Sequence, residues 1–276
     1  MEIKNLKGTS LNDIVQAITS SFADYFVQLS ADVAYWEKRF EAARVDYELS
    51  FGMFDNGQLV GFIINGIDEL NGIRTAFNTG TGVMAESRGH KIIDRLYAHA
   101  LPYLKEKGIG QCTLEVIRQN ERAIHVYERI GFHISKELKC FKGTLAVTDP
   151  GATVQKVSFD QLRDTARGYD PFYSWDNITA AAAASGGSYQ CYTVSKDGKT
   201  TGYFILNPAT NHLIQFEVTG GNTQEAIPVL LSGIATIAPE IKINNVDNTR
   251  KELTGALLAA GLDNFIDQYE MQMTLN

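Results

Sequence analysis

The stretch Val83-Met84-Ala85-Glu86-Ser87-Arg88-Gly89-His90-Lys91-Ile92-Ile93 decides the fold expected for this chain. An apolar run ends at Met84, a short turn follows, and apolar residues then recur at helical spacing as far as Leu104. This order predicts a strand, a turn and a helix, with Arg88 to Lys91 on the opening helical turn. The unpaired N–H groups and partial positive charge of a helix N-terminus suit a diphosphate. Taken alone, the turn is better explained as an ordinary helix start with solvated basic residues, because short glycine-containing turns are common.

A second strand and helix follow downstream. Cys112 to Ile117 is short, apolar and β-branched, and the next segment reads Asn120-x-x-Ala123-x-x-x-Tyr127-x-x-x-Gly131-Phe132. Asn120 is a good helix cap. The spacings of three, four and seven predict that Asn120, Ala123 and Tyr127 share one helical face. Tyr127 would then point the same way as the cap, although a lone tyrosine on an amphipathic helix is more often a core residue.

Together these two segments resemble the GNAT family of acetyl-CoA-dependent acyltransferases. In that family a strand reading V-x-P-x-x-R-G-x-G-x-G/A precedes the diphosphate-binding helix, and the family's N-x-x-A-x-x-x-Y-x-x-x-G-F is met here in full. The departures are Ala85 for Pro, Lys91 for the second Gly and Ile93 for the last Gly/Ala. The resemblance covers roughly the N-terminal half of the chain and implies an α/β (α+β) fold. It predicts a mixed, mostly antiparallel sheet with flanking helices and one parallel strand pair that splays apart.

The resemblance also implies acetyl-CoA as cosubstrate. Its pantetheine arm would pair with the strand end, and its diphosphate would bind the amides of the turn. The residues expected to contact it are Val83, Met84, Arg88, Gly89, His90, Lys91, Ile92, Ile93, Asn120 and Ala123.

The implied reaction is direct acetyl transfer to a primary amine, without a covalent acyl-enzyme. Tyr127 would protonate the departing CoA thiolate, and a backbone N–H near Val83 would stabilise the oxyanion. Glu115 is a weak candidate for the general base, and a chain of water molecules is favoured over any single carboxylate.

Four aromatic and acidic residues near the N-terminus are candidates for the acceptor site by resemblance: Asp24, Tyr25, Tyr35 and Trp36. For any one of them, a pair of amphipathic helices packed on the sheet is the favoured explanation. The acceptor itself stays open among small amines, amino acids, aminoglycosides and peptide N-termini, since acceptor loops vary most in this fold.

Two hairpins are predicted upstream of the cofactor segment. Asp55-Asn56-Gly57 and Glu69-Leu70-Asn71-Gly72 separate apolar runs, which predicts a meander of three strands.

The second half repeats the first in outline. Residues 196–205 align with residues 55–64, and the segment from Asn248 to Gly261-Leu262 is similar to that from Asn120 to Gly131-Phe132. No Arg-Gly turn follows Val218, and Leu257 occupies the Tyr127 position. We therefore predict a catalytic acyl-CoA-binding domain at 1–148 and a degenerate GNAT-like domain at 151–276, with Gln268 to Met273 as its last strand. Two domains also fit the length of 276 residues.

Composition limits the function classes. A net charge of −7 argues against a nucleic-acid partner, and no apolar run approaches the roughly 20 residues of a membrane helix. Three cysteines without paired spacing and a beginning unlike a signal peptide predict reduced thiols and a cytoplasmic location. The five histidines show no metal-ligand spacing, so we expect no metal.

Two other functions are compatible with the sequence. One is a non-catalytic acyl-CoA sensor, and the other is an interaction scaffold. Retention of Tyr127 favours catalysis over sensing, because a pure binder needs no acid for the thiolate. The loss of the motif residues from the second half alone argues against a scaffold.

Overall fold

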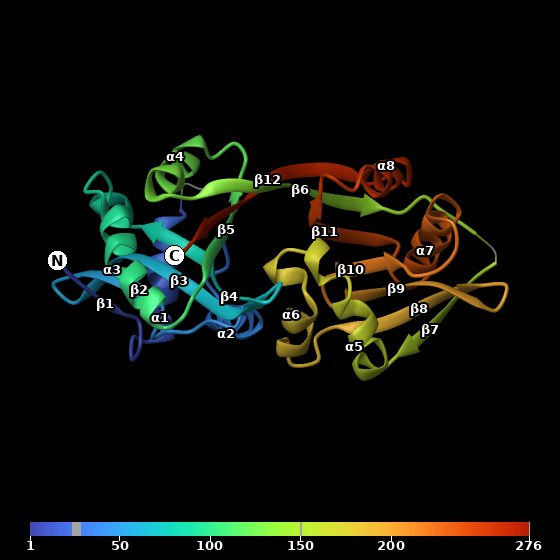
Figure 1. The fold of residues 1–276 in the computed structure, drawn as a ribbon, viewed down its shortest axis with the longest axis horizontal. Coiled ribbons are helices and arrows are strands. Elements are labelled where there is room, and N and C mark those ends of the chain that lie inside the picture. The colour runs from blue at the N-terminus through green and yellow to red at the C-terminus, as the bar shows by residue number, and fades with distance from the viewer. Residues whose placement is uncertain (24–28, 150, 276) are drawn as a thin grey trace. The chain divides into compact units, whose positions relative to one another are not determined.

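The computed structural model describes residues 1–23, 29–149 and 151–275, which form two compact units (Figure 1). The first unit comprises Met1–Ser135 together with Glu270–Asn276, and the second comprises Lys136–Tyr269. Elements that begin in the first unit are β1 (Glu2–Asn5), α1 (Leu11–Ser21), α2 (Val33–Ala42), β2 (Phe51–Asp55), β3 (Gln58–Leu70), β4 (Ile73–Val83), α3 (Ile92–Glu106), β5 (Gln111–Ile117), α4 (Glu121–Ile130) and β6 (His133–Thr144).

The sheet of the first unit is mostly antiparallel with one parallel pair. Strands β1, β2, β3 and β4 pair antiparallel in that order, and β4 pairs parallel with β5. Asn56 and Gly57 in the first hairpin, and Asn71 and Gly72 in the second, all have positive φ. Positive φ at both central residues is what a two-residue hairpin of this twist needs. Both predicted hairpins and the predicted fold class are confirmed.

Helices cover both faces of this sheet. Phe62 and Ile64 of β3 belong to one apolar cluster with α1 and α2, which includes Ile14, Trp36 and Phe40. Strand residues alternate between faces. Accordingly, Gly61 approaches Ile92 at the start of α3 on the opposite face, where an added Cβ would lie 2.6 Å from the Ile92 Cγ2 atom. The glycine therefore lets the first turn of α3 sit directly on β3.

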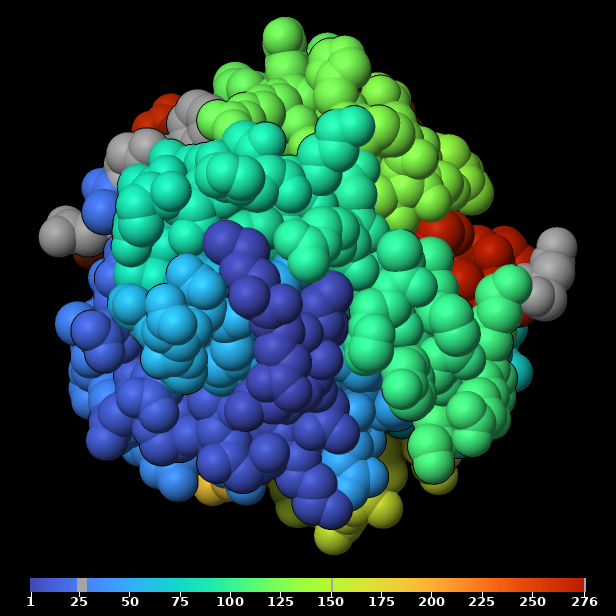
Figure 2. Space-filling view, turned by 90° about the vertical axis from the view of Figure 1, so that its left-hand side faces the viewer, coloured from blue at the N-terminus to red at the C-terminus, as the bar shows by residue number. Residues whose placement is uncertain are grey.

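The last residues of the chain complete the first unit. The Leu275 N–H donates to the Gly110 carbonyl oxygen over 2.8 Å, and the Gln272 Nε2 donates to the Gln111 Oε1 over 2.8 Å. On the other side, the Ser135 hydroxyl donates to the Glu270 carboxylate over 2.9 Å. The end of the chain thus lies between β5 and the start of β6. In the space-filling view the N-terminal residues (dark blue) form part of the surface of this unit (Figure 2).

The second unit repeats the same plan. Its elements are β7 (Ala152–Val157), α5 (Phe159–Arg167), α6 (Thr179–Ala184), β8 (Gln190–Lys196), β9 (Lys199–Asn207), β10 (His212–Val218), α7 (Thr223–Ile237), β11 (Glu240–Asp247), α8 (Lys251–Ala259) and β12 (Asp263–Thr274). Strands β7 to β10 pair antiparallel, and β10 pairs parallel with β11. Residues 136–144 of β6 continue this sheet, because β6 pairs antiparallel with β11.

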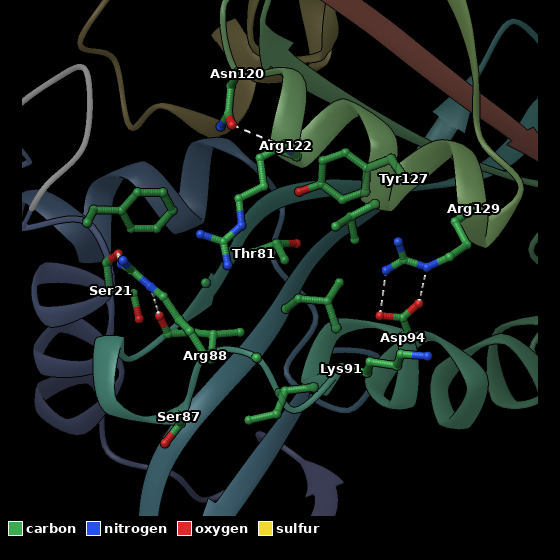
Figure 3. A pocket seen from close by; sticks show the side chains of 18 residues that line it. Ser21, Thr81, Ser87, Arg88, Lys91, Asp94, Asn120, Arg122, Tyr127 and Arg129 are labelled. Atoms are coloured by element: carbon green, nitrogen blue, oxygen red, sulfur yellow. Dashed lines mark hydrogen bonds and ion pairs between the residues drawn. The ribbon is translucent and has the colours of Figure 1, made fainter.

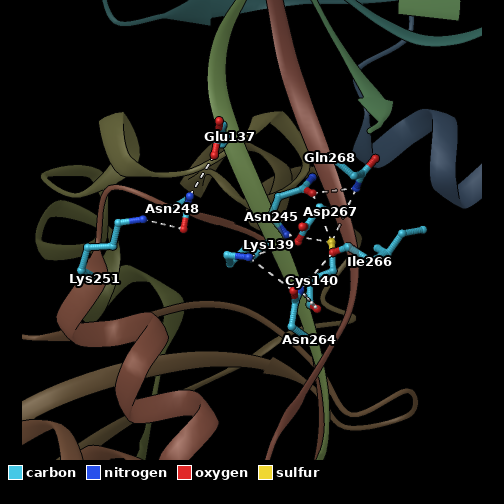
Figure 4. A network of polar contacts seen from close by, with 10 residues as sticks. All are labelled: Glu137, Lys139, Cys140, Asn245, Asn248, Lys251, Asn264, Ile266, Asp267 and Gln268. Carbon is cyan, nitrogen blue, oxygen red and sulfur yellow. Dashed lines mark hydrogen bonds and ion pairs between the residues drawn. The ribbon is translucent and has the colours of Figure 1, made fainter. Parts of the chain in front are cut away.

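A polar network ties β6, β11 and β12 together inside the second unit (Figure 4). The Gln268 amide donates to the Asn245 Oδ1 over 2.7 Å, and the Asn264 amide donates to the Cys140 carbonyl oxygen over 3.0 Å. Asn245 and Cys140 are buried. A buried polar group needs partners, so these bonds fix which residues of β12 face β6.

The boundaries between the two compact units differ from the predicted domain boundary. The predicted junction at 148–151 lies inside the second unit, in the connection between β6 and β7. The segment predicted as the last strand of the second copy is also divided, since Glu270 to Met273 belong to the first unit. Because β12 is one continuous strand, its sequence contains no signal for the residue at which it passes from one unit to the other. In the described part of the chain no helix is long and apolar enough to cross a membrane.

Candidate active site

Strand β4 leaves its parallel neighbour at the base of a cavity of about 440 Å³ in the first unit. The paired residues of β4 and β5 run from Thr75 and Gln111 to Asn78 and Leu114. Beyond that point Thr81, Gly82 and Val83 line the cavity (Figure 3). Strand β3 still pairs with one edge of β4 at these residues, whereas the pairing with β5 has ended. The edge that faced β5 can therefore offer backbone N–H and C=O groups to a ligand.

A loop follows β4 and leads into α3. Residues 85–87 form a short 3-10 turn, Gly89 has a φ of +87°, and Lys91 caps the helix with a φ of +53°. Helix α3 therefore begins at Ile92. The prediction that Arg88 to Lys91 form the opening helical turn was wrong, because left-handed backbone at Lys91 cannot continue a right-handed helix.

The loop nevertheless lines the cavity through Arg88, Gly89 and Lys91, and the first turn of α3 lines it through Ile92 and Ile93. These residues bring the N-terminus of α3 and its unpaired N–H groups to the cavity wall. Such a terminus is suited to bind phosphate.

Arg88 holds two elements together. Its Nη2 donates to the Ser21 carbonyl oxygen over 2.8 Å, and its Nε donates to the Val83 carbonyl oxygen over 3.3 Å. The guanidinium thus joins the end of α1 to the end of β4, and its charge lies at the cavity wall. This link explains why Ser21 and Phe22, which no local motif marks, also line the cavity.

Helix α4 supplies the opposite wall. Asn120 caps the helix, since its Oδ1 accepts from the Ala123 N–H over 3.2 Å, and Tyr127 lies two turns further along. Both side chains line the cavity together with Ala123. Figure 3 shows the Tyr127 hydroxyl directed into the cavity. The Tyr127 ring is half-buried and packs edge-on against Phe132 with ring centroids 5.8 Å apart.

Charged side chains line the rim of the cavity. Arg129 of α4 donates two hydrogen bonds to the Asp94 carboxylate of α3, over 2.7 and 2.9 Å. This pairing holds the pKa of Asp94 below its usual range. Arg122 and Lys91 also line the cavity, which makes it basic (Figure 3).

Not every predicted site residue faces the cavity. All of the predicted cofactor contacts line it except Met84 and His90. Met84 is buried, with its sulfur 3.8 Å from the Gln58 Nε2, and His90 Nδ1 lies 3.2 Å from the Ser87 carbonyl oxygen. Glu115 lies on β5 and is not among the residues that line the cavity.

The predicted acceptor residues lie away from the cavity or outside the described chain. Asp24 and Tyr25 fall outside the described residues. Trp36 is buried, and its indole N–H donates to the Ser30 carbonyl oxygen over 2.7 Å. Tyr35 is exposed at the surface of α2. The structure therefore places Trp36 in the core, as the helix-pair interpretation expects.

Several lining residues were not predicted from the sequence: Ser21, Phe22, Thr81, Gly82, Ser87, Asp94, Arg122, Val126 and Arg129. Arg122, Val126 and Arg129 lie four and three residues apart, on a stripe of α4 beside that of Asn120, Ala123 and Tyr127, so the spacing of the motif did not select them. Thr81 and Gly82 immediately precede the strand end already assigned to the cofactor. Ser21 and Phe22 come from a distant helix, and no spacing rule reaches them.

The second unit has a cavity in the corresponding place, of about 490 Å³, but its walls differ. The Phe216 N–H of β10 donates to the Tyr173 hydroxyl over 3.0 Å, and the Tyr169 hydroxyl donates to the Val218 carbonyl oxygen over 3.3 Å. Arg250 lies beside them and donates to the Glu217 carboxylate over 2.7 Å. The strand end that would pair with pantetheine is thus already bonded to side chains.

Leu257 of α8 is fully buried in the core of the second unit. It therefore offers no counterpart to the Tyr127 hydroxyl. Among the described residues, no group of His, Cys, Asp and Glu side chains could hold a metal ion.

Comparison with known proteins agrees with this architecture. Residues 15–132 match the model of the Acetyltransferase (GNAT) family. N-alpha-acetyltransferase 30 of Schizosaccharomyces pombe is 32% identical over 92 residues, which are 33% of this chain and 61% of that protein. The chain thus spans less than two thirds of the length of this relative.

Many solved structures resemble the whole chain, and two of them serve as examples. One is a tandem GNAT protein from the clavulanic acid biosynthesis pathway, with a TM-score of 0.70 at 13% identity, covering 100% of this chain and 98% of that one. The other is a putative acetyltransferase from Pyrococcus horikoshii, with a TM-score of 0.68 at 13% identity, covering 100% and 89%. Residues 15–132 of the first unit thus resemble the GNAT acetyltransferase family, and the chain is similar in fold to a tandem GNAT protein.

Proposed function

We propose that this chain is an N-acetyltransferase that moves an acetyl group from acetyl-CoA to a primary amine in the cavity of the first unit. One observation carries the proposal. A splayed strand end, a basic helix N-terminus and the Tyr127 hydroxyl line the same cavity of about 440 Å³. A strand end suits the amides of pantetheine, a helix terminus suits a diphosphate, and a phenol suits a thiolate.

The residues of the chain have separable roles. The backbone of Thr81 to Val83 would hold the pantetheine arm, and the loop from Arg88 to Ile93 would hold the diphosphate with help from Lys91 and Arg122. Acetyl-CoA supplies an acetyl thioester as the electrophile. As the amine nitrogen bonds to the acetyl carbon and the C–S bond breaks, the Tyr127 hydroxyl proton passes to the sulfur. The amine gives up its own proton to water, and a proton from solvent restores the Tyr127 hydroxyl.

Tyr127 is a weak acid for this task. A phenol has a pKa near 10 and a thiol one near 8.5, so proton transfer from Tyr127 is uphill by about 2 kcal/mol unless the site assists it. A short, oriented hydrogen bond must supply that assistance.

The shortage of carboxylates that could act as a general base favours an acceptor with an α-amino group. Of the described lining residues, Asp94 is the one carboxylate, and it is bound to Arg129. An α-amino group has a pKa near 8, so about one molecule in ten is already neutral at pH 7, against fewer than about one lysine side chain in a thousand. An α-amine therefore needs least help from a base, and water can accept its proton. The similarity to an N-alpha-acetyltransferase supports the same choice.

The proposal is tested on the full chain in two steps. Calorimetry with acetyl-CoA measures binding, and thiol release from acetyl-CoA measures transfer. The acceptors would be a peptide with a free α-amino group, the same peptide with a blocked N-terminus and a free lysine, and an aminoglycoside. We expect binding and the fastest thiol release with the free α-amine. If acetyl-CoA binds tightly but none of the three acceptors causes thiol release, catalysis is overturned and the acyl-CoA sensor becomes the better explanation.

A further inference from the structure

The Arg88 side chain is bonded to the protein backbone through two of its nitrogens. Its Nη2 donates to the Ser21 carbonyl oxygen over 2.8 Å, and its Nε donates to the Val83 carbonyl oxygen over 3.3 Å. An arginine that grips a phosphate uses two nitrogens of one edge at once. Nε and Nη2 form such an edge. Because both donate to carbonyl groups of the chain, this edge is not offered to a phosphate.

Helix α1 has no cation of its own at its C-terminus. Its last turn contains no basic residue, and it ends at Ser21. The last four carbonyl groups of a helix lack partners within the helix and carry partial negative charge. A guanidinium that donates to one of them is a stabilising partner. Arg88, which lies 67 positions away in the sequence, supplies that partner (Figure 3).

The end of α1 packs directly on the backbone of β4. A Cβ added at Gly82 would lie 2.9 Å from the Ser21 Cβ, so the glycine makes room for this contact. Gly82 pairs with Phe62 of β3, and paired residues lie on the same face of a sheet. Phe62 packs with α1 and α2. Ser21 thus lies over the strand end on the face that α1 covers.

The cavity therefore has walls on both faces of the sheet. Ile92 and Ile93 line it on the face that α3 covers, where the start of α3 is suited to a diphosphate. Ser21 and Phe22 line it on the face that α1 covers. The gap beyond the last β4–β5 pair joins the two sides.

We propose that Arg88 is a positioning residue for the amine acceptor, and that it acts by holding the end of α1 against the strand end. This inference rests on the proposed function, in which acetyl-CoA binds with its diphosphate at the start of α3. The thioester then lies in the gap and is open toward α1. The amine reaches it along the wall that Ser21 and Phe22 form. The charges that remain for the phosphates are those of Lys91 and Arg122.

The first test needs no acceptor. Hydrogen exchange followed by mass spectrometry measures the opening of the last turn of α1, where the Phe22 N–H donates to the Ile18 carbonyl oxygen. In the full chain, Arg88→Gln should speed exchange there about tenfold, because a hydrogen bond from a charged donor is lost. Exchange at the end of α4 should stay the same and is the internal control. Unchanged exchange at the end of α1 in a folded variant would overturn the proposal.

The second test compares two cations of the same loop. Arg88→Gln should raise the KM of a peptide with a free α-amino group about tenfold at saturating acetyl-CoA, with a smaller effect on kcat. Its acetyl-CoA affinity, measured by calorimetry, should change by less than about twofold.

Lys91→Gln is the matched comparison, because Lys91 is exposed and also lines the cavity. It should weaken acetyl-CoA binding a few-fold, most at low salt, and leave the peptide KM and the exchange of α1 unchanged. A tenfold or larger loss of acetyl-CoA affinity in Arg88→Gln, with normal exchange at α1, would assign the Arg88 guanidinium to the diphosphate instead.

Arg88→Lys separates the bridge from the charge. An ammonium keeps the positive charge but lacks the planar edge that reaches two carbonyl groups at once. It should recover only part of the slow exchange and of the low KM. Full recovery by lysine would contradict the bridging role. This variant also serves if Arg88→Gln does not fold.

The outcomes separate this inference from the proposed function. If the unmodified chain acetylates no amine, the proposed function fails and this inference fails with it. If the unmodified chain acetylates the peptide but Arg88→Gln changes neither the exchange of α1 nor the peptide KM, the inference alone is wrong.

Discussion

At the residue scale, the Tyr127 hydroxyl is the group on which the proposed chemistry depends. Replacing Tyr127 by phenylalanine removes the proton donor but keeps the ring that packs on Phe132. We expect kcat to fall about 100-fold or more, as is typical for the loss of a general acid, with acetyl-CoA affinity nearly unchanged. Thiol-release kinetics and calorimetry on the same preparation measure the two quantities. A tenfold or larger loss of affinity would make the acid role untenable.

The Asp94–Arg129 pair is a second residue-scale feature, since it places a carboxylate at the rim of a cavity proposed to bind a diphosphate. Asp94→Asn removes a negative charge and leaves Arg129 free to attract phosphate, so acetyl-CoA should bind a few-fold more tightly. Arg129→Gln leaves the Asp94 charge unneutralised and should weaken binding by a similar factor.

Calorimetry at two salt concentrations checks this pair of variants. Both effects should shrink at high salt because the groups are partly exposed. Changes of the same sign in the two variants would contradict the electrostatic explanation.

At the element scale, the contact of α3 with β3 positions the helix terminus. Gly61→Ala would place a Cβ 2.6 Å from the Ile92 Cγ2 atom at the first residue of α3. We expect a loss of about 1–3 kcal/mol in the free energy of unfolding, as for other overpacked sites, and weaker acetyl-CoA binding. Urea denaturation measures the first effect and calorimetry the second.

The chain offers a matched control and a rescue for this substitution. Gly255→Ala, on helix α8, meets no atom within 4 Å and should be neutral or stabilising. Ile92→Leu removes the Cγ2 atom that an alanine at 61 would meet, so the double variant should recover part of the loss. A double variant as unstable as Gly61→Ala alone would show that another contact is responsible.

At the scale of the whole molecule, the first unit depends on the end of the chain. Residues 270–275 lie between β5 and the start of β6, although none of them lines the cavity. A chain that stops at Tyr269 should therefore lose acetyl-CoA binding, because the edge of β5 is left with unpaired N–H and C=O groups. Calorimetry and circular dichroism measure binding and folding.

Removal of Asn276 alone is the control for this truncation and should bind normally. Full binding by the chain that stops at Tyr269 would contradict the dependence. The same reasoning predicts that a fragment of residues 1–148 is not an independent catalytic domain, whatever its motifs.

The sequence by itself determined the local structure of this protein. Asn-Gly pairs at 56–57 and 71–72 adopt positive φ, and Asn120 caps its helix, because these preferences act within a few residues. Because such preferences act over short distances in the sequence, the sequence alone also predicted the cofactor segments on β4, the following loop and α4. The start of α3 was misplaced because a non-glycine residue, Lys91, adopts a left-handed conformation that its side chain does not announce.

Only the tertiary structure decided which distant groups meet. It brought Ser21 to the Arg88 guanidinium, buried Tyr97 behind the cavity with Asn78, and used the last strand of the chain to complete the first unit. These contacts join residues tens to hundreds of positions apart, and they depend on how sheets and helices pack. The spacing of residues within a segment does not identify such distant partners. Many different apolar or polar side chains would give the same helix or strand pattern.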